Sequence, residues 1–105
     1  MVQEGMTYIL WEFTVSAEQS PAFENAYKAD GVWAQLFRRD PAYVETVLVA
    51  DREQPGRYVT IDVWEDRNSY LSFKERFAGD YRKIDEECEK LTLSERLIGI
   101  FESVQ

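Results

Sequence analysis

The chain contains no histidine and has only one cysteine, Cys88, in its 105 residues. The absence of histidine excludes His-ligated haem, zinc sites that contain histidine and every catalytic triad that uses an imidazole. A single cysteine cannot form an intrachain disulfide or a CxxC pair, and it is typical of a protein of the reducing cytoplasm. We therefore expect a cytoplasmic protein without a transition-metal site.

Long hydrophobic runs and an excess of basic residues are also absent. No stretch approaches the roughly 20 apolar residues that span a membrane, and no secretory signal is visible. The 20 acidic and 12 basic residues give a net charge of −8. A surface of that sign repels phosphate groups, so we expect binding neither to nucleic acid nor to membranes.

Aromatic residues, in contrast, are abundant. They make up 14% of the chain, and they can fill a core or line a pocket for flat ligands. The length fits one domain. Because residues 1–6 show no periodicity, we expect a flexible tail over 1–6 and a single domain over 7–105.

The hydrophobic pattern predicts an α+β fold. Alternating segments indicate strands over 7–15, 43–51, 57–65 and 92–101. One helical region follows Ser16, a candidate N-cap, and a second begins near Arg67 and is interrupted at Gly79 and Asp80. The order βαββαβ with right-handed crossovers predicts a ferredoxin-like, four-stranded antiparallel sheet in the order 4-1-3-2, with helices on one face.

The other face of this sheet is too apolar to remain in water. The third strand carries Val59, Ile61 and Val63 on one face, and the first strand has apolar residues on both faces, such as Ile9 and Leu10. A sheet that is apolar on both faces must be covered twice. The chain has no further element to do so, and we therefore expect a homodimer.

The segment Tyr58–Glu65, with the sequence YVTIDVWE, is followed by Tyr70 and Phe73 on the next helix. Together with the last strand, these residues resemble the antibiotic biosynthesis monooxygenase family of the dimeric α+β barrel superfamily. The resemblance implies a pocket between sheet and helices in each protomer. It also implies that four residues of the third strand face this pocket: Tyr58, Thr60, Asp62 and Trp64.

The same resemblance implies a cofactor-independent monooxygenase that acts on a small aromatic or polyketide-like substrate. It assigns site positions to Thr60, Trp64 and Tyr70, with Arg82 as the nearest arginine. Thr60 stands where such enzymes carry an amide. The alternative is a non-catalytic domain of the same fold that binds a small ligand or serves in assembly, and a filled interior would favour it.

A carboxylate in the middle of a central strand should not be buried without a partner, which makes Asp62 a candidate proton acceptor. Glu12 on the adjacent strand is expected near the same cavity, although either carboxylate could instead pair with Arg82, Arg96 or a tyrosine hydroxyl. The predicted catalytic residues are Asp62, Trp64 and Tyr70. The predicted substrate-binding residues are Tyr27, Trp33, Tyr58, Thr60, Phe73, Tyr81, Glu12 and Arg82.

Overall fold

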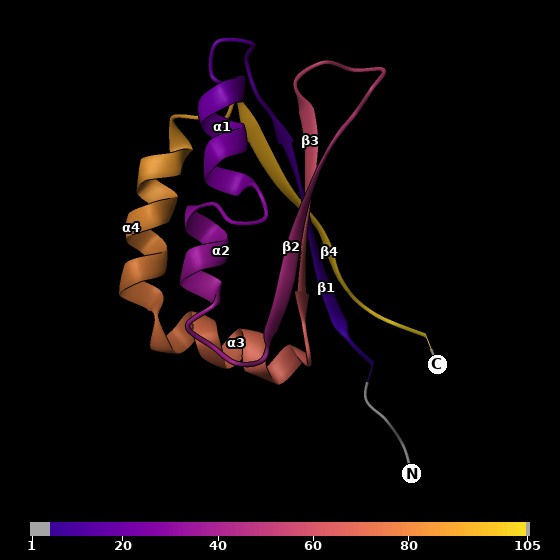
Figure 1. Cartoon of the computed structure of the whole chain (residues 1–105), viewed down its shortest axis with the longest axis vertical. Coiled ribbons are helices and arrows are strands. Elements are labelled where there is room, and N and C mark those ends of the chain that lie inside the picture. Colours follow the sequence, from indigo (N-terminus) through magenta and orange to yellow (C-terminus); the bar gives the residue numbers. More distant parts are fainter. Residues whose placement is uncertain (1–4, 105) are drawn as a thin grey trace.

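The computed structural model of the chain describes residues 5–104. Its elements are, in chain order, β1 (Thr7–Thr14), α1 (Ser20–Tyr27), α2 (Val32–Phe37), β2 (Tyr43–Ala50), β3 (Arg57–Trp64), α3 (Arg67–Arg76), α4 (Ala78–Glu89) and β4 (Ser94–Glu102). The strands form one antiparallel sheet in the order β2-β3-β1-β4. This confirms the predicted strand order and the ferredoxin-like fold. The helices lie on one face of the sheet, with α3 crossing one end (Figure 1).

The β2–β3 hairpin depends on one glycine. Gly56 has a φ of 88°, a left-handed conformation that side chains with a Cβ rarely adopt. A Cβ at this position would also lie 2.4 Å from the carbonyl oxygen of Val15. The carbonyl of Gly56 in turn accepts a hydrogen bond from the backbone N–H of Val15 at 2.8 Å. The turn therefore fastens the hairpin to the end of β1.

The first helix begins later than the sequence predicts. Ser16 is not its N-cap, because α1 starts at Ser20. The hydroxyl of Ser16 instead accepts a hydrogen bond from the backbone N–H of Gln19 at 3.3 Å, in the turn that precedes the helix. Pro21 lies in the first turn of α1, where its missing N–H leaves no bond unmade.

The second helical region divides at Phe77, so the prediction of a break at Gly79 and Asp80 is wrong by two residues. Gly79 and Asp80 lie in the first turn of α4. The ring of Phe77 packs on that of Phe73, with centroids 4.8 Å apart. Phe77 itself leaves the helical conformation, with a φ of −112° and a ψ of 28°, so the break does not require a glycine.

The ends of the described chain lie beside each other. The predicted tail over 1–6 falls largely outside the described residues. Met6 is held by Ser103, whose backbone N–H donates to the Met6 carbonyl at 3.0 Å and whose hydroxyl accepts from the Met6 N–H at 2.9 Å.

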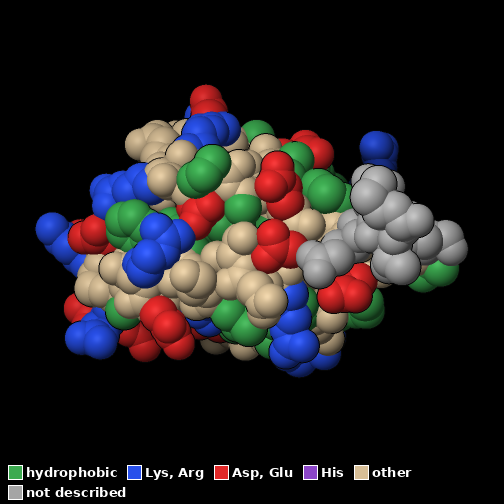
Figure 2. Space-filling model, turned by 90° about the horizontal axis from the view of Figure 1, so that it is seen from below, with side chains coloured by type: hydrophobic (Ala, Val, Ile, Leu, Met, Phe, Trp, Pro, Cys, Tyr) green, Lys and Arg blue, Asp and Glu red, His purple; other side chains and the backbone are tan. Residues whose placement is uncertain are grey.

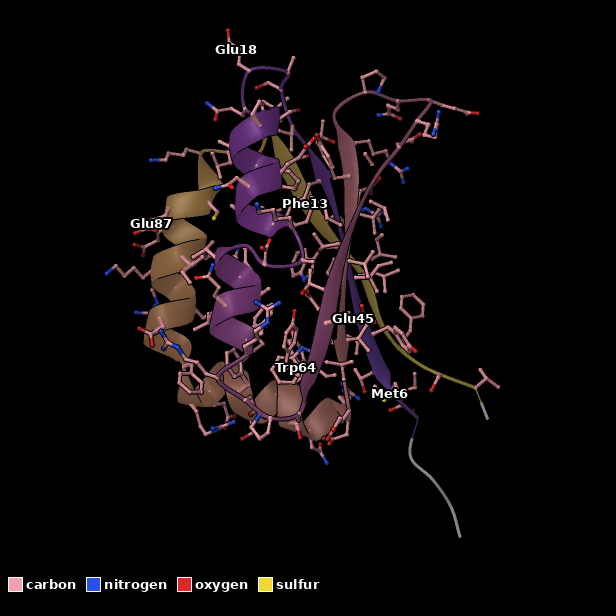
Figure 3. The ribbon with its side chains drawn as sticks, viewed as in Figure 1. Met6, Phe13, Glu18, Glu45, Trp64 and Glu87 are labelled. Carbon is pink, nitrogen blue, oxygen red and sulfur yellow. The ribbon has the colours of Figure 1, made fainter. Side chains whose placement is uncertain are left out.

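An aromatic core fills the space between the sheet and the helices. Trp64 is fully buried, and its ring lies 5.3 Å from that of Phe73 and 5.8 Å from that of Phe37. Phe13 and Trp64 lie on the helix side of the sheet, whereas Glu18 and Glu87 point away from the molecule (Figure 3).

The opposite face of the sheet is open along the described chain (Figure 1). Register places Val47 opposite Ile61 and Val49 opposite Val59, so these apolar side chains share that face. Val47 is 37% exposed and Val49 is 43% exposed. This part of the face is therefore apolar and uncovered within one copy of the chain.

The surface elsewhere is mixed in charge. Figure 2, which shows the end of the molecule that carries α3, has acidic and basic side chains interspersed. Among the helices of the described chain, none combines the length and the apolar character needed to cross a membrane.

Candidate functional site

A cavity of about 260 Å³ lies between the sheet and the helices. Its aromatic lining comes from both sheet and helices and consists of Trp11, Phe13, Tyr27, Trp33, Phe37 and Tyr81. Its polar lining consists of Thr46, Thr60, Asp62, Lys74, Asp85 and Glu95. The cavity is therefore large enough for a small flat ligand and offers both apolar walls and charged groups.

Asp62 is the buried acid of this cavity, with only 9% of the residue exposed. Its carboxylate accepts a hydrogen bond of 2.6 Å from the hydroxyl of Thr46. The Thr46 hydroxyl has one proton to give, so it accepts in turn from the hydroxyl of Tyr43, also at 2.6 Å. No ion pair reaches Asp62 within residues 5–104.

Burial determines the chemistry of this carboxyl group. Loss of hydration raises the pKa of Asp62 to about 6, although the hydrogen bond from Thr46 acts in the opposite direction. A carboxylate with a pKa near 6 is a stronger base than an exposed one and is still ionised at neutral pH. Asp62 can therefore accept a proton from a bound acid.

Trp64 and Tyr70, the two other predicted catalytic residues, do not line the cavity. Both are buried, and their rings contact each other at 5.6 Å in the core. Burial, and to a lesser extent the charge of Asp62, raises the pKa of Tyr70 to about 12, so Tyr70 lies close to the acid. These two aromatic residues therefore belong to the core next to the cavity and do not contact its interior.

The predicted substrate-binding residues fall into two groups. The structure brings Tyr27, Trp33, Thr60 and Tyr81 together around the cavity. It places Tyr58, Phe73, Glu12 and Arg82 elsewhere. The Tyr58 hydroxyl donates to Glu24 at 2.5 Å, Phe73 packs in the core, and Arg82 is exposed on α4.

Glu12 requires a correction, because the expectation that it shares a cavity with Asp62 is wrong. Strand pairing sets Ile9 opposite Asp62 and Glu12 opposite Val59, so the two carboxylates point to opposite faces of the sheet. On the open face Glu12 pairs with Arg96 at 2.7 Å and Arg57 at 2.5 Å. Hydrogen bonds from these two guanidinium groups, Arg96 first, lower the pKa of Glu12.

Sequence reasoning missed several lining residues: Trp11, Phe13, Phe37, Thr46, Lys74, Asp85 and Glu95. A signal existed for two of them. Lys74 follows Tyr70, and Asp85 follows Tyr81, by four residues on a helix, which places each pair on one face. The Lys74 ammonium lies 5.5 Å from the ring centre of Tyr70 and 5.3 Å from that of Tyr81.

The arrangement can bind a flat ring and remove a proton from it. Aromatic walls supply stacking surfaces, Asp62 supplies a base, and Lys74 is the one cation among the described lining residues. The carboxylates Asp85 and Glu95 add negative charge where the cavity meets solvent. The polar stripe of β3 thus faces the helices, as the resemblance implies.

Solved structures share this fold over almost the whole chain. SnoaB from Streptomyces nogalater, a cofactor-independent oxygenase solved as a mutant, matches with a TM-score of 0.75 at 21% identity, over 96% of this chain and 95% of that one. A conserved protein from Methanosarcina mazei Go1 matches with a TM-score of 0.71 at 12% identity, over 95% of this chain and 94% of that one. At these identities the likeness shows the fold alone.

The family is established by the sequence comparison. No curated protein matches the chain. The model of the family described as antibiotic biosynthesis monooxygenase matches residues 6–77, which include β1, the β2–β3 hairpin and α3. This match spans well over half of the chain, and the chain belongs to the antibiotic biosynthesis monooxygenase family.

Proposed function

We propose that the chain is a cofactor-independent monooxygenase that acts on a small aromatic or polyketide-like substrate in the cavity between sheet and helices. One observation carries the proposal: a buried carboxylate with its pKa raised to about 6, Asp62, lines an aromatic cavity. Core packing alone gives no reason to bury such an acid without a cation. The family membership and the fold of SnoaB, a cofactor-independent oxygenase, support the reaction type.

In the proposed reaction Asp62 accepts a proton from an acidic C–H or O–H group of the substrate ring. Lys74 stabilises the resulting enolate or phenolate oxygen, and Thr60 provides a hydroxyl in place of the amide implied by the family pattern. The electron-rich ring carbon is oxidised by molecular oxygen, first to a hydroperoxide. Loss of water then leaves a ketone, so that one CH₂ group and O₂ give one C=O group and H₂O.

Trp64 and Tyr70 enter this proposal as positioning residues. Both lie outside the cavity; Tyr70 is close enough to Asp62 for the acid's charge to raise its pKa, and Trp64 packs against Tyr70. The family resemblance implies an arginine in the site, with Arg82 as the nearest one, but Arg82 is exposed and does not line the cavity. In this proposal Lys74 supplies the positive charge instead.

The test is a screen of hydroquinones and anthrone-like phenols for oxygen uptake, without added flavin or metal. We expect one of them to be oxidised, and Asp62→Asn to abolish the uptake. Glu87→Gln, which changes an exposed acid that points away from the cavity (Figure 3), is the control and should keep full activity. Equal oxygen uptake by Asp62→Asn and the natural chain would contradict the role of Asp62.

A homodimer through the open sheet face is part of this proposal. Apolar side chains of β2 and β3, including Val47, Val49, Val59 and Ile61, share that face. Two copies packed face to face would remove this surface from water and close a barrel. The cytoplasmic location stays a prediction that rests on the single cysteine.

One observation favours a second candidate, a ligand-binding domain without turnover. Two of the three predicted catalytic side chains, Trp64 and Tyr70, pack in the core. Under this alternative the cavity would bind phenols in a saturable way, and oxygen uptake would stay at the rate of the protein-free solution. Binding measured by calorimetry beside oxygen uptake separates the two functions.

A further inference from the structure

The cavity lining contains more negative than positive groups. Asp62, Asp85 and Glu95 contribute three carboxyl groups, and Lys74 contributes one ammonium group. None of these four side chains takes part in an ion pair among residues 5–104. Their charges are therefore available to a ligand.

The carboxyl groups of Asp62 and Glu95 lie at opposite ends of the cavity. Asp62 on β3 is opposite Ile9 of β1, whereas Glu95 on β4 is opposite Phe13 of β1. Two strand spacings and four residues along β1 separate the acids, which places their Cα atoms roughly 17 Å apart. Asp62 therefore occupies one end of the cavity, and Glu95 occupies the other.

Asp85 belongs to the Glu95 end. Both residues line the cavity, and after burial itself the charge of Asp85 contributes most to raising the pKa of Glu95. The Lys74 ammonium lies between the ends, because it is close to both Tyr70 and Tyr81. In addition to burial, the charge of Asp62 raises the pKa of both tyrosines, and the charges of Asp85 and Glu95 raise that of Tyr81. The cavity thus has two exposed acids at one end and the buried acid Asp62 at the other, with Lys74 between them.

Aromatic rings line the space between the ends. Trp11 and Phe13 form a floor on β1, with ring centroids 6.5 Å apart and planes inclined by 30°. Tyr27 and Trp33 line the cavity from the helix side. Trp33 is 8% exposed, and its indole N–H has no acceptor in the part of the chain that the structure describes. That N–H is buried among the surrounding side chains and is not exposed to the cavity.

Such rings beside carboxylates suit an organic cation, because the ring faces and the acids both attract positive charge. We propose that the ligand of this cavity is an aromatic compound that carries an ammonium group, with the ammonium between Asp85 and Glu95 and the ring over Trp11 and Phe13. This inference rests on the proposed function only in placing the substrate ring in the same cavity. It adds that the substrate is an amine, with its acidic ring position directed toward Asp62.

Three probes with the same ring test the charge preference: naphthylmethylammonium, the neutral naphthylmethanol and the anionic naphthoate. Calorimetry on the full chain at neutral pH measures their affinities. We expect the ammonium compound to bind roughly tenfold more tightly than the alcohol, and naphthoate to bind most weakly. In the double variant Asp85→Asn/Glu95→Gln this preference should disappear, while the alcohol keeps its affinity.

The control is Glu87→Gln, which removes an acid of α4 that points away from the cavity and should preserve the preference. Equal or tighter binding of the alcohol or naphthoate to the natural chain would overturn the inference. So would a preference that survives in the double variant, or no binding of the ammonium probe at millimolar concentration. A thermal melt of each variant establishes that it is folded.

The outcome is separable from that of the proposed function. Oxygen uptake that depends on Asp62, together with equal binding of the three probes, would refute the amine preference and leave the oxygenase standing. A clear preference for the ammonium probe without oxygen uptake from any phenol would support the amine site and contradict the oxygenase.

Discussion

Replacing Asp62 with asparagine should stabilise the chain, and more so as the pH rises. The pKa of this carboxyl is about 6 in the folded chain, against an ordinary value of 3.8. The folded state therefore holds the proton more tightly than the unfolded state does, and ionisation at high pH opposes folding. The cost is absent well below pH 3.8, grows between pH 4 and 6, and reaches about 3 kcal/mol at pH 8.

Asparagine keeps the side-chain volume and an oxygen that can accept the hydrogen bond from Thr46, but it does not titrate. At pH 5 the cost of ionising Asp62 is only about half of its value at pH 8, so the advantage of the variant should grow by about 1–2 kcal/mol between pH 5 and pH 8. Comparing two pH values cancels any constant penalty for burying the amide. The lower limit of pH 5 avoids the region of the isoelectric point near 4.5, where solubility is lowest.

Urea unfolding at fixed protein concentration measures this difference, and thermal melts should show it as a change of roughly 4–16 °C. Glu87→Gln serves as the control, because it changes an exposed acid and should alter stability by less than about 0.5 kcal/mol at both pH values. A stability difference that stays constant from pH 5 to pH 8, or that favours the natural chain more at pH 8, would refute the assignment of Asp62 as a buried acid without a cation.

Three further predictions follow from the geometry. If Asp62 is the proton acceptor, kcat/KM should rise with pH through an apparent pKa near 6. Thr46→Val removes a hydrogen bond to the carboxylate and should shift this apparent pKa to a higher value. An apparent pKa that is the same in Thr46→Val and the natural chain would contradict the prediction. Ile61→Asp should place a charge on the apolar face of each protomer and dissociate the proposed dimer in sedimentation, whereas a natural chain that sediments as a monomer would refute the barrel. Trp64→Ala should lower the free energy of unfolding by about 3–5 kcal/mol in denaturant titrations, and a loss below about 1 kcal/mol would mean that Trp64 does not hold the core.

The sequence by itself determined the fold and the family. Period-two alternation in the strands and the order of the elements led to the sheet order that the structure has. The motif around Trp64 pointed to the family whose model matches residues 6–77. These features are local or follow from chain order, so one sequence is enough to predict them.

Only the tertiary structure decided which side chains meet. Glu12 and Asp62 look equivalent along the chain, but the register of β1 against β3 sends them to opposite faces. Likewise, Thr46 becomes the partner of Asp62 because the β2–β3 register brings them together. Such pairings depend on how strands align, and a shift of one residue reverses every face, which is why the pattern of a single strand cannot fix its partners.

The boundary between core and cavity was decided in the same way. Trp64 and Trp33 are both aromatic residues on apolar faces, yet Trp64 is enclosed by Phe37, Tyr43 and Phe73, whereas Trp33 borders open space. Whether a ring fills the core or lines a cavity depends on the side chains that pack around it from other elements. The sequence supplied the aromatic residues and the buried acid, and the packing of the helices on the sheet decided which of them a ligand can reach.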